Sequence, residues 1–154
     1  MPTINAVKQH ILNLNAEIMN SEHPKFGFKD VDKNQMREEL LNPHRNIVRM
    51  LLKLLAYDNE EQTEHLPEKW EIEHILPKKW HNSYFPNELD AEVDKTIEHL
   101  GNKIPFEKKL NIEASNGYFS KKKESYEKST IAIVKRLSES HLTDWKLEQI
   151  RERY

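Results

Sequence analysis

The stretch EIEHILP, residues 71–77, decides how this chain is expected to fold. In this stretch and the tryptophan before it, apolar and acidic residues alternate, and this period of two predicts a strand over about 69–76 that Pro77 ends. The strand closes on an acid and a histidine, Glu73 and His74, whose side chains leave a strand on opposite faces. The pair is therefore either an ordinary half-buried strand end or the first part of a catalytic site.

The composition describes a chain that must fold by packing alone. It has 154 residues, which is enough for one domain with a real core, and it contains no cysteine. Disulfide frameworks and thiolate zinc sites are therefore excluded. No apolar run is long enough to span a bilayer, and the N-terminus lacks a basic region followed by an apolar one. We expect no membrane association and a cytoplasmic location.

The net charge of -2 conceals two parts of opposite sign. Residues 1–100 hold 12 lysines and arginines against 18 aspartates and glutamates, whereas residues 101–154 hold 12 against 8. A basic C-terminal part suits a polyanionic substrate bound on one side, and charge of this kind is also common on ordinary solvated surface.

The rest of the chain is mainly helical by its apolar spacing. Apolar residues recur at steps of three and four, and polar stretches with proline or glycine separate the runs. Gly101 marks a turn into a second, short strand. The helices are expected over about 4–18, from Pro43 to Leu55 with Asn42 as N-cap, over 88–99 with a cap at Asn87, over 112–139, and onward from a cap near Thr143.

Five polar side chains that are able to do chemistry follow the order strand, insertion, short strand, helix. Glu73 and His74 end the first strand, Asn102 precedes the second, and Asn111 and Asn116 lie near the helix start. Each one alone has an ordinary interpretation as a surface pair, a turn residue or a helix cap. Their occurrence in series is what favours a site.

Four segments carry a resemblance to a known family. EHILP, LGN, LNIEASNGYFSKK and the closing WKLEQIRER, in this order, resemble the HNH (His-Me finger) nuclease domain at the C-terminal end of GmrSD-type and phosphorothioation-dependent (Ssp-type) restriction proteins. The resemblance covers roughly 43–154 and, less closely, the leading helix. It implies an α+β, mainly helical fold: a ββα-metal core over 69–154, with an N-terminal helical part, 1–68, packed on it in one compact domain.

The resemblance also implies a role for each of the five polar residues. His74 is the general base, which suits an imidazole that is largely neutral at cellular pH, and Asn102 braces the loop that holds it. Glu73 is a ligand of Mg²⁺ or Mn²⁺, with Asn111 as the carboxamide ligand and Asn116 as the alternative. Strand twist and the proline that follows would allow the acid and the histidine to flank one phosphate from different sides.

Three consecutive lysines, residues 121–123, lie in the predicted long helix. Lys122 matches a basic position of the family pattern, and the resemblance implies that it contacts a DNA phosphate, with Lys121 and Lys123 beside it. The same run also suits an ordinary solvated face.

Two features depart from the compact spacing of such nucleases. Asn102 lies twenty-eight positions after His74, so an insertion must lie between the two strands. No histidine occupies the helix start, so few protein ligands would hold the metal.

The predicted function is hydrolysis of DNA phosphodiester bonds by a metal-dependent endonuclease domain of a bacterial anti-phage restriction protein. The resemblance implies an N-terminal nucleotide-hydrolysing or sensor domain as its partner, and with three glycines this chain has no glycine-rich phosphate loop of its own. Two alternatives stay open, a non-catalytic helical module that binds DNA or a protein, and a nuclease directed at RNA.

Overall fold

The computed structural model describes residues 9, 12–14, 16 and 32–153. Most of the helix expected over 4–18, and most of the polar loop expected after it, lies outside these residues.

The chain divides into two compact units, Met1–Met36 and Arg37–Tyr154. The second unit contains both strands of the described residues and all of the predicted site residues. The boundary expected between residues 68 and 69 falls inside this unit.

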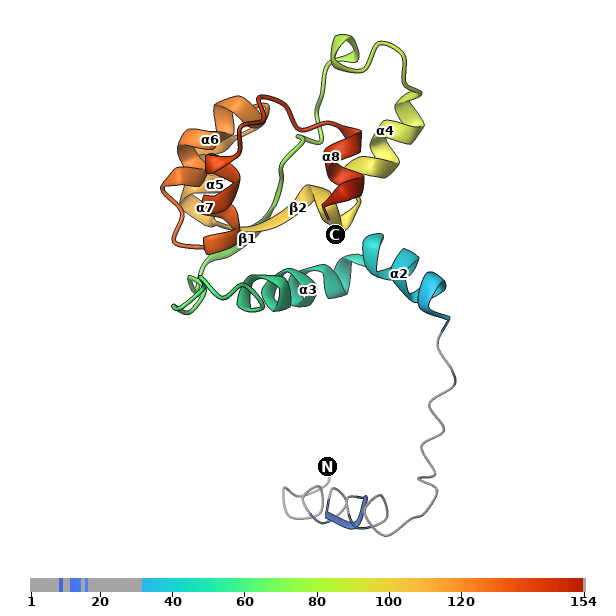
Figure 1. The fold of residues 1–154 in the computed structure, drawn as a ribbon, viewed down its shortest axis with the longest axis vertical. Coiled ribbons are helices and arrows are strands. Elements are labelled where there is room, and N and C mark those ends of the chain that lie inside the picture. Colours follow the sequence, from blue (N-terminus) through green and yellow to red (C-terminus); the bar gives the residue numbers. More distant parts are fainter. Residues whose placement is uncertain (1–8, 10–11, 15, 17–31, 154) are drawn as a thin grey trace. The chain divides into compact units, whose positions relative to one another are not determined.

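The described residues have an α+β architecture that is mainly helical, as the sequence predicts (Figure 1). Two short strands lie among the helices, and two 3-10 turns flank the helix of the insertion. The elements are α2 (Lys33–Leu41), α3 (Arg45–Tyr57), β1 (Trp70–His74), η1 (Asn82–Tyr84), α4 (Asp90–Ile97), η2 (Leu100–Asn102), β2 (Lys103–Glu107), α5 (Lys108–Ala114), α6 (Phe119–Glu127), α7 (Ala132–Glu139) and α8 (Leu147–Glu152).

The two predicted strands are confirmed and pair antiparallel. Trp70 lies opposite Glu107 at one end of the pair, and His74 lies opposite Lys103 at the other. One more backbone hydrogen bond follows beyond the strands, in which the N–H of Ile75 donates to the carbonyl of residue 102 at 2.9 Å. A pair of five-residue strands is not stable alone, so helices must cover it.

One face of the sheet packs on α5, α6 and α7. Ile104 and Phe106 of β2 are fully buried in the same cluster as Phe119 and Val134 from the helices. The ring of Phe106 meets that of Tyr126 edge to face, with centroids 5.2 Å apart. Figure 1 shows these three helices grouped at one end of the strand pair. The main core therefore lies between this face and the helices.

Helix α3 packs against the strands through a second, smaller cluster. Val48 and Leu52 are buried against Trp70 and Ile72. Arg49 lies over the ring of Trp70, 3.8 Å from its centroid, and donates to the carbonyl of the same residue. None of the helices in the described part of the chain is long and apolar enough to cross a membrane.

The single long helix predicted over 112–139 is wrong, because α5, α6 and α7 take its place. Ser115 ends α5 with a φ of 48°, a left-handed conformation that a helix interior does not allow. At the second break, the hydroxyls of Ser129 and Thr130 donate to the carboxylate of Glu107. The Ser-Asn-Gly and Ser-Thr sequences at these points are turn signals that outweigh the apolar spacing.

The helix starts also differ from the prediction by a few residues. Helix α3 begins after His44, whose ring accepts a hydrogen bond from the helix backbone, rather than after Asn42. Helix α4 begins after Leu89 rather than after Asn87. Helix α8 likewise begins later than predicted.

The insertion between the strands packs against the C-terminal helix. Figure 1 shows α4 and α8 side by side, and the two helices are in contact. Helix α8 also contacts η2, and here Gly101 is required, because a Cβ at this position would lie 2.0 Å from the backbone oxygen of Ile150. The close approach fixes the turn that leads into β2.

Replacing Gly101 with Ala should destabilise the protein by about 2 kcal/mol, since the added methyl group meets backbone rather than a movable side chain. Gly117→Ala is the matched control, because its nearest neighbour would be 3.2 Å away. Urea unfolding should show a clearly smaller loss for this control. Equal losses for the two variants would contradict the close packing of α8 on the turn.

Candidate active site

The end of β1 sends Glu73 and His74 to different surroundings. The carboxylate of Glu73 is buried against α6, where it contacts Lys122 and Tyr126. The imidazole of His74 lies near Glu98, the residue that caps the C-terminal end of α4. The two side chains therefore do not share a partner. This geometry does not match the expectation that both flank one phosphate.

Lys122 occupies the interior of the site. Its side chain is 1% exposed, and its ammonium group lies 2.6 Å from Oε1 of Glu73. The same group donates to the carbonyl of His74 at 2.6 Å and to that of Ile75 at 3.3 Å. A lysine ammonium has three donors, and here each has an acceptor. A direct phosphate contact by Lys122 does not fit this placement.

Burying the two charges of the Glu73–Lys122 pair is unfavourable, but both groups have hydrogen-bond partners. Burial raises the pKa of the Glu73 carboxyl and lowers that of the Lys122 ammonium, while each charge opposes the shift of the other. The hydroxyl of Tyr126 donates to the same carboxylate oxygen at 3.2 Å. Because two carbonyls also accept from the ammonium group, the geometry favours the ionised pair.

His74 is held in its neutral form. Its side chain is 15% exposed, and burial lowers the pKa of the imidazole to about 4. Glu98 opposes this shift, whereas Lys78 and Lys103 add to it. The Nε2 atom lies 3.6 Å from Oε2 of Glu98, too far for a hydrogen bond, and this buried atom has no hydrogen-bond partner in the described structure.

Asn102 lies where the predicted bracing role requires it. The residue is fully buried, and its Oδ1 accepts from the N–H of Leu76 at 2.8 Å. Its Nδ2 donates to the carbonyls of Leu76 and Ile97, each at 3.0 Å. The side chain therefore ties the segment after His74 to the insertion and does not face a substrate.

The two predicted carboxamide ligands have different surroundings. The amide nitrogen of Asn111 donates to Oε2 of Glu71 at 3.4 Å, and Asn116 is exposed in the turn between α5 and α6. Among residues 9, 12–14, 16 and 32–153, no three His, Cys, Asp or Glu side chains form a group that could hold a metal ion. The carboxylate of Glu73 already faces an ammonium group. The described residues therefore do not form a ready metal site around Glu73.

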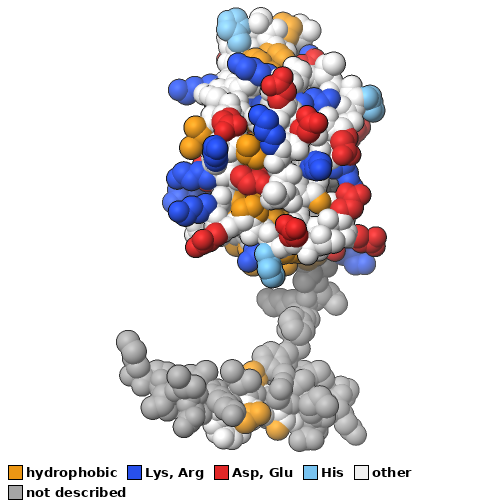
Figure 2. All heavy atoms as spheres, turned by 90° about the vertical axis from the view of Figure 1, so that its left-hand side faces the viewer, with side chains coloured by type: hydrophobic (Ala, Val, Ile, Leu, Met, Phe, Trp, Pro, Cys, Tyr) orange, Lys and Arg blue, Asp and Glu red, His pale blue; other side chains and the backbone are white. Residues whose placement is uncertain are grey.

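The lysines beside Lys122 also have different surroundings. Lys123 is partly buried and donates to the carbonyls of Ser140 and Leu142. Lys121 is exposed. On the face drawn in Figure 2, basic and acidic side chains are interspersed rather than separated into one basic surface.

Sequence reasoning missed the residues that surround His74 and Glu73. Lys78 and Lys103 each directly follow a predicted feature, the strand-ending proline and Asn102, and this proximity was a usable signal. Glu98 comes from the insertion and gave no local signal. Tyr126 was expected in the core, where it lies, but its hydrogen bond to Glu73 could not be read from the pattern.

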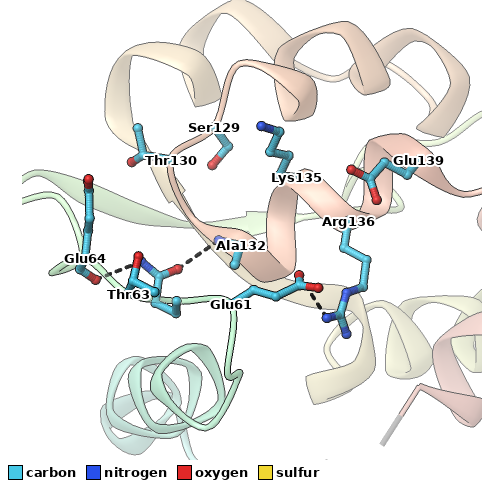
Figure 3. A pocket seen from close by; sticks show the side chains of 10 residues that line it. Glu61, Thr63, Glu64, Ser129, Thr130, Ala132, Lys135, Arg136 and Glu139 are labelled. Carbon is cyan, nitrogen blue, oxygen red and sulfur yellow. Dashed lines mark hydrogen bonds and ion pairs between the residues drawn. The ribbon is translucent and has the colours of Figure 1, made fainter.

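A polar pocket of about 550 Å³ lies away from these residues (Figure 3). It is formed by the 61–64 loop and the start of α7, where Arg136 pairs with Glu61 and the N–H of Ala132 donates to Gln62. Its lining includes none of the predicted site residues. We therefore do not assign the chemistry to this pocket.

A known family profile matches most of the chain. The profile described as GmrSD restriction endonucleases, C-terminal domain, matches residues 27–154. No curated protein and no solved structure matches the chain.

Replacing Lys122 with Met should cost about 3 to 5 kcal/mol of unfolding free energy, because it leaves the Glu73 carboxylate buried without its counter-charge. The double variant Glu73→Gln with Lys122→Met should recover at least about 1 kcal/mol of this loss in a double-mutant cycle. Lys121→Met, an exposed neighbour, should change stability by less than about 0.5 kcal/mol. Simple additivity of the two single variants would contradict the buried pair.

His74 should make the protein less stable as the pH falls from 6.5 to about 4. The unfolded chain gains a proton near the ordinary pKa of 6.5, whereas the native imidazole resists protonation until about 4. At pH 4.5 this difference is worth about 2 to 3 kcal/mol. Urea unfolding at pH 7 and pH 4.5 should therefore show a smaller acid loss for His74→Gln than for the unaltered protein. Parallel losses in the two would show that the ring titrates normally.

Proposed function

This chain belongs to the family of GmrSD restriction endonuclease C-terminal domains, and on that premise we propose that it is an HNH-type DNA endonuclease with His74 as its general base. The observation that best supports this role is the state of the imidazole, which is partly buried, neutral and has an Nε2 atom without a hydrogen-bond partner in the described structure. A base must be able to accept a proton from water, and this nitrogen has no competing donor.

The backbone around His74 is held on two sides. Lys122 donates to the carbonyls of His74 and Ile75, and Asn102 satisfies both backbone groups of Leu76. Positioning of this kind supports catalysis, because the base does not have to be ordered when substrate arrives. Asn102 and Lys122 act in this proposal as positioning residues.

The low pKa of His74 is compatible with catalysis because the substrate is an anion. A base works best when its pKa lies near the working pH, and a value of about 4 makes a weak base. A phosphodiester within hydrogen-bond distance of the ring would stabilise the imidazolium form more than the Glu98 carboxylate does, because Oε2 of Glu98 lies 3.6 Å from Nε2. Binding of DNA is therefore expected to raise the pKa of His74 toward neutrality.

Dependence on Mg²⁺ or Mn²⁺ is part of the proposal by resemblance to the family. In the described structure Oε1 of Glu73 contacts Lys122 and the amide of Asn111 donates to Glu71, and no step of the mechanism is derived through a metal. Comparing cleavage in Mg²⁺, in Mn²⁺ and in excess EDTA tests this part separately.

The biological setting proposed for this activity is an anti-phage restriction system in the bacterial cytoplasm. The choice of DNA, including any preference for phosphorothioated DNA, would be made by an N-terminal nucleotide-hydrolysing or sensor domain of the same protein or system. The resemblance supports this setting.

A second candidate is a non-catalytic module that binds DNA. The Lys122 ammonium group that faces Glu73 favours it, because an engaged carboxylate is not a free metal ligand. Such a module would bind DNA with a steep salt dependence and cut nothing.

Replacing His74 with Ala should reduce nicking of supercoiled plasmid by about 10² to 10⁴-fold, because the base is lost. His141→Ala is the matched control, since this histidine is exposed and should leave the rate unchanged. Gel assays of plasmid and of single-stranded RNA, with circular dichroism of each variant, provide the readout. Full cleavage by the His74 variant would show that this histidine is not the base. Cleavage of RNA alone would show that the substrate is RNA rather than DNA.

A further inference from the structure

Glu98 lies at the centre of a group of cations beside His74. Its Oε1 is 2.5 Å from the ammonium of Lys78, and its Oε2 is 2.9 Å from that of Lys103 and 3.6 Å from Nε2 of His74. The contributing residues come from the insertion, from the segment after β1 and from the first position of β2. One carboxylate thus holds two ammonium groups next to the proposed base.

The members of this group differ in exposure. The side chains of Lys103 and His74 are 7% and 15% exposed, whereas those of Glu98 and Lys78 are 52% and 57% exposed. The carboxylate therefore lies on the solvent side of the imidazole and of the inner lysine. Rotation of one exposed side chain would uncover both.

The inner lysine does not depend on the Glu98 carboxylate for its position. The ammonium of Lys103 also donates to the main-chain carbonyl of Glu98 at 2.5 Å. This second contact would keep the cation in place if the carboxylate moved away. The nitrogen of His74 that faces the carboxylate has no hydrogen-bond partner in the described structure. Glu98 therefore occupies the position beside this nitrogen without bonding to it.

The charges of this group indicate which kind of ligand would bind there in place of Glu98. Two lysines and one glutamate leave a surplus of one positive charge, which becomes two when the carboxylate leaves. A phosphodiester carries one negative charge on two terminal oxygens, so it can replace a carboxylate oxygen for oxygen between the same cations. It can also accept a hydrogen bond from His74 when the ring is in its imidazolium form.

We propose that Lys78, Lys103 and His74 form a binding subsite for a backbone phosphate of the nucleic acid, and that Glu98 occupies this subsite in the free protein as a substitute for that phosphate. The inference rests on the proposed function and specifies where its substrate binds. Glu98 is then a competitor of the substrate. Its contacts must break before phosphate binds, so it weakens affinity and keeps the cations from binding other anions.

An ordinary surface ion pair makes a different prediction. Exposed pairs contribute little to stability, and removing one leaves a solvated cation with a small general effect on DNA binding. A cation released within a preformed subsite should instead bind phosphate strongly. This gain should depend on the other residues of the subsite. The comparison therefore needs a second glutamate of equal exposure that releases a cation elsewhere.

Glu92 is this control. It lies on α4, its side chain is 51% exposed, and it pairs with Arg151 at 3.0 Å. Glu92→Gln and Glu98→Gln each remove one negative charge and release a basic side chain. Binding of a fluorescent 20-base-pair DNA by the full chain is measured by anisotropy in EDTA, so that no cleavage occurs.

Glu98→Gln should tighten DNA binding about three- to tenfold more than Glu92→Gln, and adding Lys78→Gln to Glu98→Gln should remove the gain, since one phosphate contact is lost. Equal affinities for the two glutamine variants would overturn the subsite, as would a gain that persists without Lys78.

Inorganic phosphate provides a second readout that does not depend on DNA being the substrate. In the Glu98→Gln variant, titration with phosphate should shift the NMR signals of the His74 ring at lower concentrations than in the Glu92→Gln variant. Identical titrations would overturn the proposal. A subsite that passes both tests in a protein that cuts no nucleic acid would refute the proposed function and leave the anion site standing.

Discussion

The ammonium group of Lys122 is the interaction on which the geometry of the site depends. It enters the interior from α6 and contacts the side chain of Glu73 and the carbonyls of His74 and Ile75. Removing a lysine from water is unfavourable, and this position is tolerated because all of its donors are used. The helix and the end of the strand are thereby fixed to each other, and Asn102 holds the next residues from the other side.

The sequence predicted the features that depend on local pattern. Alternation and the flanking proline and glycine predicted both strands. The long helix was wrong because apolar spacing continued through turns that Ser115 and the Glu107 contacts impose. The role of Lys122 could not be predicted, since lysine is rarely buried and its partners lie almost fifty residues away. Long-range pairing of charges is not encoded in any local window.

The alternation that predicted β1 also explains why its acid and histidine are separated. Neighbouring strand residues face opposite sides, and here one side is occupied by α6 and the other by the insertion. Glu73 therefore lies in the interior next to the Lys122 ammonium group, whereas His74 lies below the partly exposed charges of Glu98 and Lys78. As a metal ligand, Glu73 would have to bind a divalent ion with a carboxylate whose Oε1 already contacts Lys122. The His74 side is the one that an anionic substrate can reach without such a rearrangement.

Two glutamates thus neutralise lysines on the two sides of one strand end, and burial decides what each can do. Glu73 and Lys122 are both enclosed, so separating them would leave a charge in the interior, and the pair is structural. Glu98 is half exposed, so its carboxylate can exchange protein cations for water at small cost. Although partial burial acts to raise it, hydrogen bonds from Lys78 and Lys103 hold the pKa of Glu98 at about 2, so it remains ionised at every cellular pH. It can therefore be displaced by a competing anion but not switched off by protonation, which makes substrate binding rather than pH the event that uncovers the histidine.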